Sequence, residues 1–169
     1  MTTTAAGSGI ALHHPPTWVS YPYGMSSGMG FATLFFLSTQ PLHKPCIHVY
    51  DRHGSRVVGT CAPLLRRLTN NGLLIQWNST QLPDRDPIDR APGAPTALAT
   101  RAAKVQVLAA PKFCSSVGGK TLMTVAIGAS AEPRSQRRWY VTACLGPKDI
   151  DVNETDVLTM LNTATLPRR

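Results

Sequence analysis

Apolar and polar residues alternate with a period of two over much of the chain, which is the pattern of β-strands. In residues 138–145, for example, Trp139, Val141 and Ala143 fall on one face and Tyr140 and Thr142 on the other. The predicted strands cover residues 17–21, 30–39, 46–50, 56–60, 73–77, 104–108, 122–127 and 138–145. Short strands joined by turn-rich connections indicate an all-β fold, and we expect an eight-stranded jelly-roll β-sandwich.

One or two short helices accompany these strands. Pro63 at a first-turn position predicts a short helix over Leu64 to Leu68, which Asn70-Asn71-Gly72 would end. Asn153 is predicted to cap a second helix over 154–161, with acidic residues near the positive end of its dipole.

The 169 residues are enough for one domain and one hydrophobic core. Residues 1–16 are rich in Thr, Ser, Gly and Pro and are predicted to be a flexible N-terminal arm, with residues 17–169 forming a single jelly-roll domain. Within this domain, residues 78–100 contain four prolines and three aspartates, so we expect a long loop that serves at an interface.

The net charge indicates which classes of molecule the protein binds. Seventeen Lys and Arg residues face nine Asp and Glu residues, a formal net charge of +8, which attracts polyphosphate or anionic lipid. Arg137 and Arg138 directly precede Trp139 and Tyr140, and clustered cations beside aromatic residues are typical of RNA-binding surfaces. We interpret Trp139 as core and the arginines as phosphate contacts. The candidate RNA-binding residues are Arg66, Arg67, Arg101, Lys104, Lys112, Lys120, Arg134, Arg137 and Arg138.

A phosphate-binding P-loop and a membrane-spanning segment both find little support in the sequence. Ser115 to Thr121 resembles a phosphate-binding P-loop, but Cys114 stands where its first glycine belongs and a strand pattern follows Lys120, so Gly118-Gly119 is predicted to be a hairpin turn. Phe31 to Leu37, the longest apolar run, is too short to cross a bilayer, and no membrane insertion is expected.

The four cysteines form no C-x-x-C pair, and we interpret them as small buried hydrophobic residues of a reducing compartment. A nucleophile made of Cys46 or Cys114 with His48 remains an outside alternative, because no flanking signature supports it. The adjacent His13 and His14 are read as solvated side chains. We therefore expect no enzyme activity, no metal and no cofactor.

The stretch from Asp149 to Asp156 is acidic, whereas the preceding part of the chain is basic. An acidic segment of one copy can contact the basic surface of another, so self-association is predicted; salt-bridged surface is the alternative.

Three segments carry a resemblance to a known family: Ser27-Gly28-Met29-Gly30-Phe31-Ala32, Ile47-His48-Val49-Tyr50-Asp51, and Tyr140-Val141-Thr142-Ala143-Cys144-Leu145-Gly146-Pro147. In these segments and in size, the chain resembles the jelly-roll coat-like proteins of plant satellite viruses and satellite RNAs. The resemblance implies a protein that binds single-stranded satellite or viral RNA, self-associates, and supports movement and spread of that RNA in the plant host.

The same resemblance implies helper-virus or host movement proteins as further partners, and a place in the host cytoplasm, the nucleus or the cell periphery. Its alternative is a structural capsid protein that forms an icosahedral shell around RNA and resides in the virion. Proteins of this family carry an arginine-rich N-terminal arm, whereas the first 43 residues here contain no Lys or Arg. We therefore expect such an arm to lie outside this sequence, and the basic residues of the body to be the RNA-binding elements present here.

Overall fold

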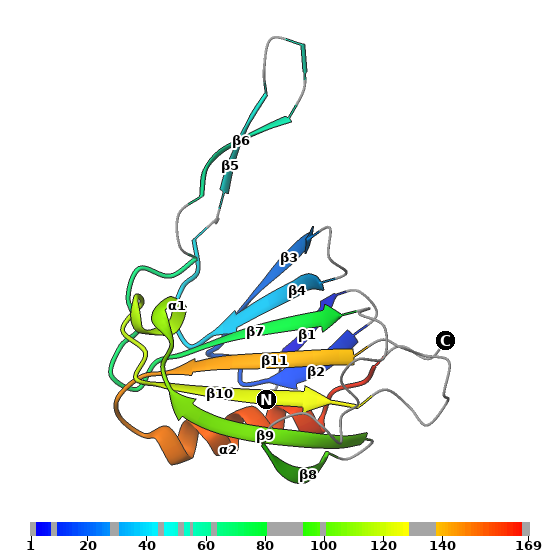
Figure 1. Cartoon of the computed structure of the whole chain (residues 1–169), viewed down its shortest axis with the longest axis vertical. Coiled ribbons are helices and arrows are strands. Elements are labelled where there is room, and N and C mark those ends of the chain that lie inside the picture. The colour runs from blue at the N-terminus through cyan, green and yellow to red at the C-terminus, as the bar shows by residue number, and fades with distance from the viewer. Residues whose placement is uncertain are drawn as a thin grey trace.

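The computed structural model describes residues 3–7, 10–27, 31–43, 46–50, 53–54, 56–61, 64–80, 93–98, 101–128 and 138–166. Strands and two helices make up most of these residues (Figure 1). The strands are β1 (Thr3–Gly7), β2 (Ile10–His14), β3 (Val19–Ser27), β4 (Phe31–Ser38), β5 (Cys46–Tyr50), β6 (Arg56–Cys61), β7 (Leu73–Thr80), β8 (Ala94–Leu98), β9 (Arg101–Ala109), β10 (Thr121–Ile127) and β11 (Arg138–Leu145). The helices are α1 (Lys112–Ser115) and α2 (Ile150–Asn162).

The centre of the molecule is a seven-stranded sheet in the order β3-β4-β7-β11-β10-β9-β8, in which every neighbouring pair is antiparallel. β1 pairs with β2 and β5 pairs with β6 in two further hairpins. The all-β prediction is confirmed. The jelly roll is not confirmed, because its two packed sheets are replaced in the described residues by one large sheet and two small hairpins.

One face of the large sheet carries the main core. Ile75 and Trp77 of β7, Val141 of β11 and Val125 of β10 are all buried there, and the ring of Phe35 stacks on Trp77 with centroids 5.5 Å apart. The core residue predicted at Trp139 is confirmed. Figure 1 shows α2 and the β1–β2 hairpin behind this sheet. Val157, Met160 and Leu161 of α2 join the same core, so the helix closes this face.

The two edge strands of the sheet each contain a proline, Pro22 in β3 and Pro95 in β8. A proline has no amide hydrogen for the ladder, so it is tolerated where one side of the strand has no partner. The prediction that residues 78–100 form one long loop is wrong in part, because β7 extends to Thr80 and residues 94–98 form the edge strand β8. Residues 81–92 of that range, with most of its prolines, lie outside the described residues.

The predicted flexible arm is also wrong where the structure describes it. β2 pairs with β1, and both Ile10 and Leu12 are only 1% exposed in the main core. His14, predicted to be solvated, is 2% exposed, and its Nδ1 lies 2.8 Å from the Pro15 carbonyl oxygen. The buried residues of β2 are every second residue: Ile10, Leu12 and His14. The prediction of a flexible arm rested on composition and did not consider this two-residue period.

The helix predictions are corrected as well. Residues 64–68 are irregular, because the Leu64 carbonyl accepts from His43 N (2.8 Å) and Leu68 N donates to the Val117 carbonyl (2.6 Å). The C-terminal helix exists but begins at Ile150, after Asp149 in a left-handed conformation (φ 57°). Asn153 is therefore a buried residue inside α2 and not its cap. The short helix α1 was not predicted.

Candidate nucleic-acid interface

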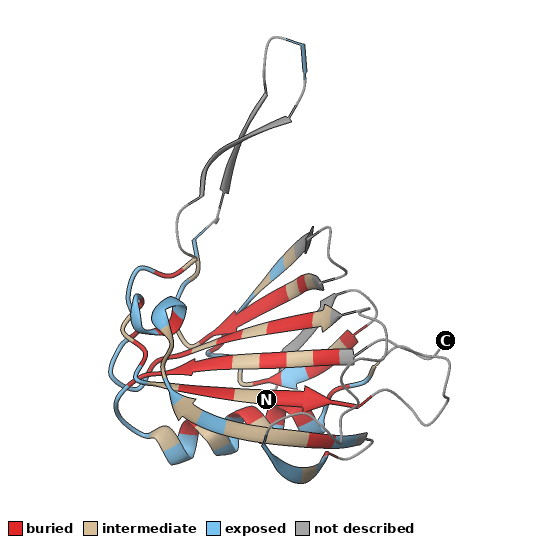
Figure 2. Ribbon diagram, viewed as in Figure 1, coloured by how far each residue is buried: buried red, intermediate tan, exposed pale blue. Residues whose placement is uncertain are grey.

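On the central strands, the second face of the sheet is less buried than the core face (Figure 2). On β7 and β11, buried residues of the core face alternate with half-buried residues of this face, among them Gln76 and Thr142. The register aligns six residues across six neighbouring strands: Tyr21, Phe36, Gln76, Thr142, Thr124 and Gln106. We call this set the transverse row. It consists of aromatic, amide and hydroxyl side chains; Phe36 is buried, and the other five are half-buried.

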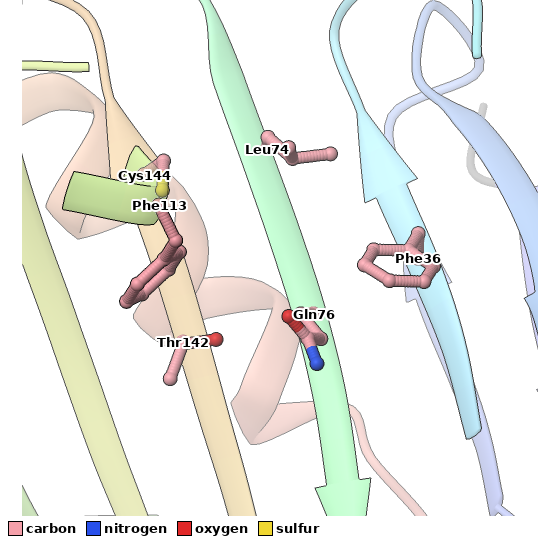
Figure 3. Close-up of a pocket in the computed structure, with 6 residues that line it drawn as sticks. All are labelled: Phe36, Leu74, Gln76, Phe113, Thr142 and Cys144. Carbon is pink, nitrogen blue, oxygen red and sulfur yellow. The ribbon is translucent and has the colours of Figure 1, made fainter. Parts of the chain in front are cut away.

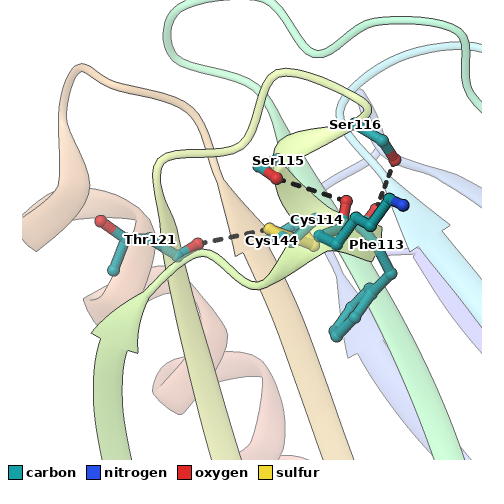
Figure 4. Close-up of a disulfide and its surroundings, with 7 residues drawn as sticks. Phe113, Cys114, Ser115, Ser116, Thr121 and Cys144 are labelled. Carbon is teal, nitrogen blue, oxygen red and sulfur yellow. Dashed lines mark hydrogen bonds between the residues drawn. A yellow bond between two sulfur atoms is a disulfide. The ribbon is translucent and has the colours of Figure 1, made fainter.

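A small second core bounds the transverse row on one side. Cys114 and Val117, in and after α1, pack with Leu65 and Leu68 on Leu122 and Cys144 of the sheet. A disulfide joins Cys114 to Cys144, with their Cα atoms 5.5 Å apart (Figure 4). The two cysteines are buried as predicted, but they are bonded rather than free. Cys114 is therefore unavailable as the nucleophile of the alternative enzyme hypothesis.

The glycine pair before Lys120 serves this small core. Gly118 has a left-handed φ of 89°, and a Cβ at Gly119 would lie 2.5 Å from Cys114 Sγ. The strand β10 begins directly after Lys120. The left-handed turn requires glycine at position 118, and the close approach of Cys114 requires glycine at position 119. The fold therefore explains the glycine pair that makes this segment resemble a P-loop.

Three connections meet at the α1 end of the sheet. Leu68 N donates to the Val117 carbonyl (2.6 Å), and Lys148 N donates to the Asn70 carbonyl (2.8 Å). These contacts bring together five exposed cations, Arg66, Arg67, Lys112, Lys120 and Lys148, which we call the basic end. Among the described residues of the same connections, Asp149 is the one carboxylate. A depression of about 340 Å³ adjoins Arg67 and is lined by Leu68, Thr69 and Asn70.

Four of the predicted RNA-binding residues, Arg66, Arg67, Lys112 and Lys120, therefore lie together. Lys104 lies half-buried in β9, near the other end of the sheet. Arg101 begins β9 and Arg138 begins β11, both at that far end of the sheet. Because β11 spans seven residue steps, its Arg138 end lies about 24 Å from the end that adjoins the basic end. Arg134 and Arg137 lie outside the described residues. Lys148 was missed by the sequence analysis because it is isolated among acidic residues in the chain.

A small cavity of about 40 Å³ opens where α1 meets the transverse row (Figure 3). Its lining residues are Phe36, Leu74, Gln76, Phe113, Thr142 and Cys144. In Figure 3 the Phe113 ring extends from α1 on one side, and the Phe36 ring stands on the other. Phe113 is 55% exposed, which is unusual for phenylalanine, and no pattern in the sequence distinguished it from a core residue.

Hydrogen bonds determine how Gln76 faces this cavity. Its Nε2 donates to Asn78 Oδ1 (2.8 Å) and to Thr33 Oγ1 (3.0 Å), and the Thr33 hydroxyl donates to the same Asn78 oxygen (2.9 Å). Both N–H groups of the Gln76 amide are therefore used within the sheet, and Oε1 is the atom left to accept from a ligand. Figure 3 shows this oxygen on the side of Gln76 that faces Thr142.

Among the described residues, the carboxylates lie mainly on α2, which covers the opposite face of the sheet: Asp151, Glu154 and Asp156. Desolvation by partial burial, followed by repulsion from Asp151, raises the pKa of Glu154 above its ordinary value. The described residues thus separate positive charge at the basic end from negative charge along α2.

No three His, Cys, Asp or Glu side chains approach closely enough to hold a metal ion in the part of the chain that the structure describes. Among the same residues, no helix has both the length and the apolar character needed to cross a membrane. No protein-family model matches the sequence, and no curated protein is significantly similar to it.

Proposed function

We propose that the protein binds single-stranded RNA, with the basic end as its main phosphate-binding surface. The observation that carries this proposal is the convergence of Arg66, Arg67, Lys112, Lys120 and Lys148 from three separate connections. Phosphate neutralisation requires cations clustered in space, and these cations lie beside the transverse row of aromatic and polar side chains, five of which are half-buried.

Replacing the triad Arg66, Arg67 and Lys120 with alanine tests this proposal. All three are exposed, so the fold should tolerate the change. Each phosphate contact contributes about −0.7 to the log–log salt slope of single-strand binding, so the slope should flatten by about 2. Fluorescence anisotropy with a labelled single-stranded RNA at several salt concentrations measures this slope.

The matched control replaces the triad Arg134, Arg137 and Arg138, which the sequence analysis favoured, with alanine. It removes the same number of charges from the region of the chain that leads into the far end of the sheet. If this control flattens the slope while the Arg66 triad leaves it unchanged, the basic end is not the phosphate-binding surface.

We also infer self-association, with the acidic residues of α2 in one copy against the basic end of another. Its support is the separation of charge between these two regions, together with exposed Val152 on α2. A charge-driven oligomer should dissociate as salt rises, and sedimentation equilibrium at two ionic strengths measures this. A strict monomer at both would contradict the inference.

The biological role we propose rests on the resemblance to coat-like proteins of plant satellite viruses and satellite RNAs. In this role the protein binds satellite or viral RNA and supports its spread in the host, together with helper-virus or host movement proteins. The alternative is a capsid protein that encloses RNA in a shell. Electron microscopy of the protein with RNA separates the two, since a shell gives closed particles of uniform size.

A further inference from the structure

We propose that the cavity between Phe36 and Phe113 is a subsite for one unpaired nucleobase, which stacks on Phe113 and inserts its edge toward Gln76 and Thr142. This inference rests on the proposed function, because the basic end supplies the phosphate contacts that bring a strand to the subsite. It adds that the protein recognises bases as well as phosphates.

The exposure of Phe113 is the first argument. A phenylalanine residue that is 55% exposed leaves apolar surface in water, although apolar packing is available within the second core close by. The turn that presents it is held by the Ser116 hydroxyl, which donates to the Phe113 carbonyl (3.0 Å), and by the disulfide of Cys114 (Figure 4). Phe113 is therefore held in place on the surface, which suits a stacking platform.

The two polar residues of an otherwise apolar lining are the second argument. Gln76 and Thr142 are directly opposite each other on β7 and β11, and both are half-buried. Gln76 presents an acceptor, because both of its N–H groups are bonded to Thr33 and Asn78. The Thr142 hydroxyl can donate or accept. An acceptor beside a hydroxyl fits the base edges in which a donor adjoins an acceptor.

The dimensions are the third argument. β4 and β11 are separated by β7, so the strands that carry Phe36 and Thr142 are about 10 Å apart. The side chain of Gln76 on β7 lies between them, so the remaining cavity of about 40 Å³ admits only the edge of a base. The base face would then rest on the exposed Phe113 ring.

The basic end makes RNA the occupant that the surface favours. Lys112 directly precedes Phe113 in α1, and Lys120 follows the turn that closes the same small core. A stacked base therefore has cations next to it for its flanking phosphates. Bases in a duplex are already stacked and paired, so the subsite requires a single strand.

The test uses the whole protein and two labelled RNA oligomers of equal length, one intact and one abasic at every position, which carry the same number of phosphates. Wild type should bind the intact oligomer more tightly. Phe113→Ala should weaken binding of the intact oligomer by about 5- to 150-fold, the range for loss of one base–aromatic stack. It should leave the abasic oligomer unaffected, and Phe113→Trp should restore binding. Thr142→Val should weaken intact-oligomer binding with less effect on the abasic one.

Equal binding of the intact and abasic oligomers by wild type would overturn the subsite, as would unchanged binding of the intact oligomer by Phe113→Ala. In either case, a loss of binding in the Arg66, Arg67 and Lys120 variant would leave the proposed function standing. If wild type binds neither oligomer, the proposed function fails together with the subsite. Circular dichroism of each variant confirms that the sheet is intact.

Discussion

Ala11 and Thr165 exchange two backbone hydrogen bonds, although 154 residues separate them. Ala11 N donates to the Thr165 carbonyl (3.1 Å), and Thr165 N donates to the Ala11 carbonyl (2.7 Å). The Thr165 hydroxyl adds a bond to the same Ala11 oxygen (3.1 Å). The segment that follows α2 is thereby joined to β2, and both pack against the same core.

Leu12→Ala should therefore destabilise the whole domain. Leu12 is 1% exposed in the main core, and removal of a buried leucine side chain costs about 2–5 kcal/mol. Urea unfolding followed by circular dichroism measures the free energy of unfolding. Thr17→Ala, at a nearby exposed position, is the control and should change that free energy by less than about 0.5 kcal/mol. Similar values for the two variants would mean that β2 is not part of the core.

Asn78→Ala should destabilise the sheet and also alter the proposed base subsite. Asn78 is 2% exposed, and its oxygen accepts from both Thr33 and Gln76, so its removal leaves the buried Thr33 hydroxyl and one N–H of the half-buried Gln76 unpaired. An unpaired buried donor costs about 1–3 kcal/mol, to be measured by chemical denaturation. Gln106→Ala, at a half-buried position in the transverse row, should cost less. Equal losses would argue against the hydrogen-bond network.

The disulfide between Cys114 and Cys144 should stabilise the folded protein. It closes a loop with a sequence separation of 30, for which loop-closure entropy predicts about 3–4 kcal/mol. In a Cys46→Ser/Cys61→Ser background these two are the remaining cysteines, so thermal unfolding with and without a reductant isolates their effect. A midpoint that is unaffected by reductant, with two free thiols by titration, would contradict the bond. Further replacement of both cysteines by alanine should make the midpoint insensitive to reductant.

Glu154→Gln should stabilise the fold at neutral pH. The folded-state pKa of Glu154 is raised above its ordinary value of 4.5, so the fold disfavours the ionised carboxylate. The wild type bears no such penalty below the ordinary pKa, and the penalty develops as pH rises through the raised one. The difference in free energy of unfolding between variant and wild type should thus be near zero below pH 4.5 and positive at pH 7.

The second cause of the raised pKa provides a control for this prediction. Asp151 repels the ionised form of Glu154, so Asp151→Asn should reduce the gain from Glu154→Gln. Denaturant titrations of wild type, the two single variants and the double variant at acid and neutral pH measure this coupling. A Glu154→Gln effect that is the same at both pH values would contradict an origin in ionisation.

Local pattern in the sequence determined the strands and the faces of β11. Trp139, Val141 and Ala143 alternate with polar residues, and a strand has a period of two whatever its partners are. The β-branched run after Lys120 likewise predicted strand β10 and excluded a P-loop helix. Charge composition predicted a basic protein, and four of the nine candidate residues lie together at the basic end.

Only the tertiary structure decided how the strands assemble, because period-two alternation does not specify a strand's neighbours or the number of sheets. It placed β7 beside β11 and separated Arg138 from Arg66, since proximity in space follows strand order rather than chain distance. It also decided that Leu12 is core and Phe113 is surface. Both are apolar, and their burial depends on which distant segments pack over them: α2 joins the core that buries Leu12, whereas Phe113 stays 55% exposed beside the transverse row.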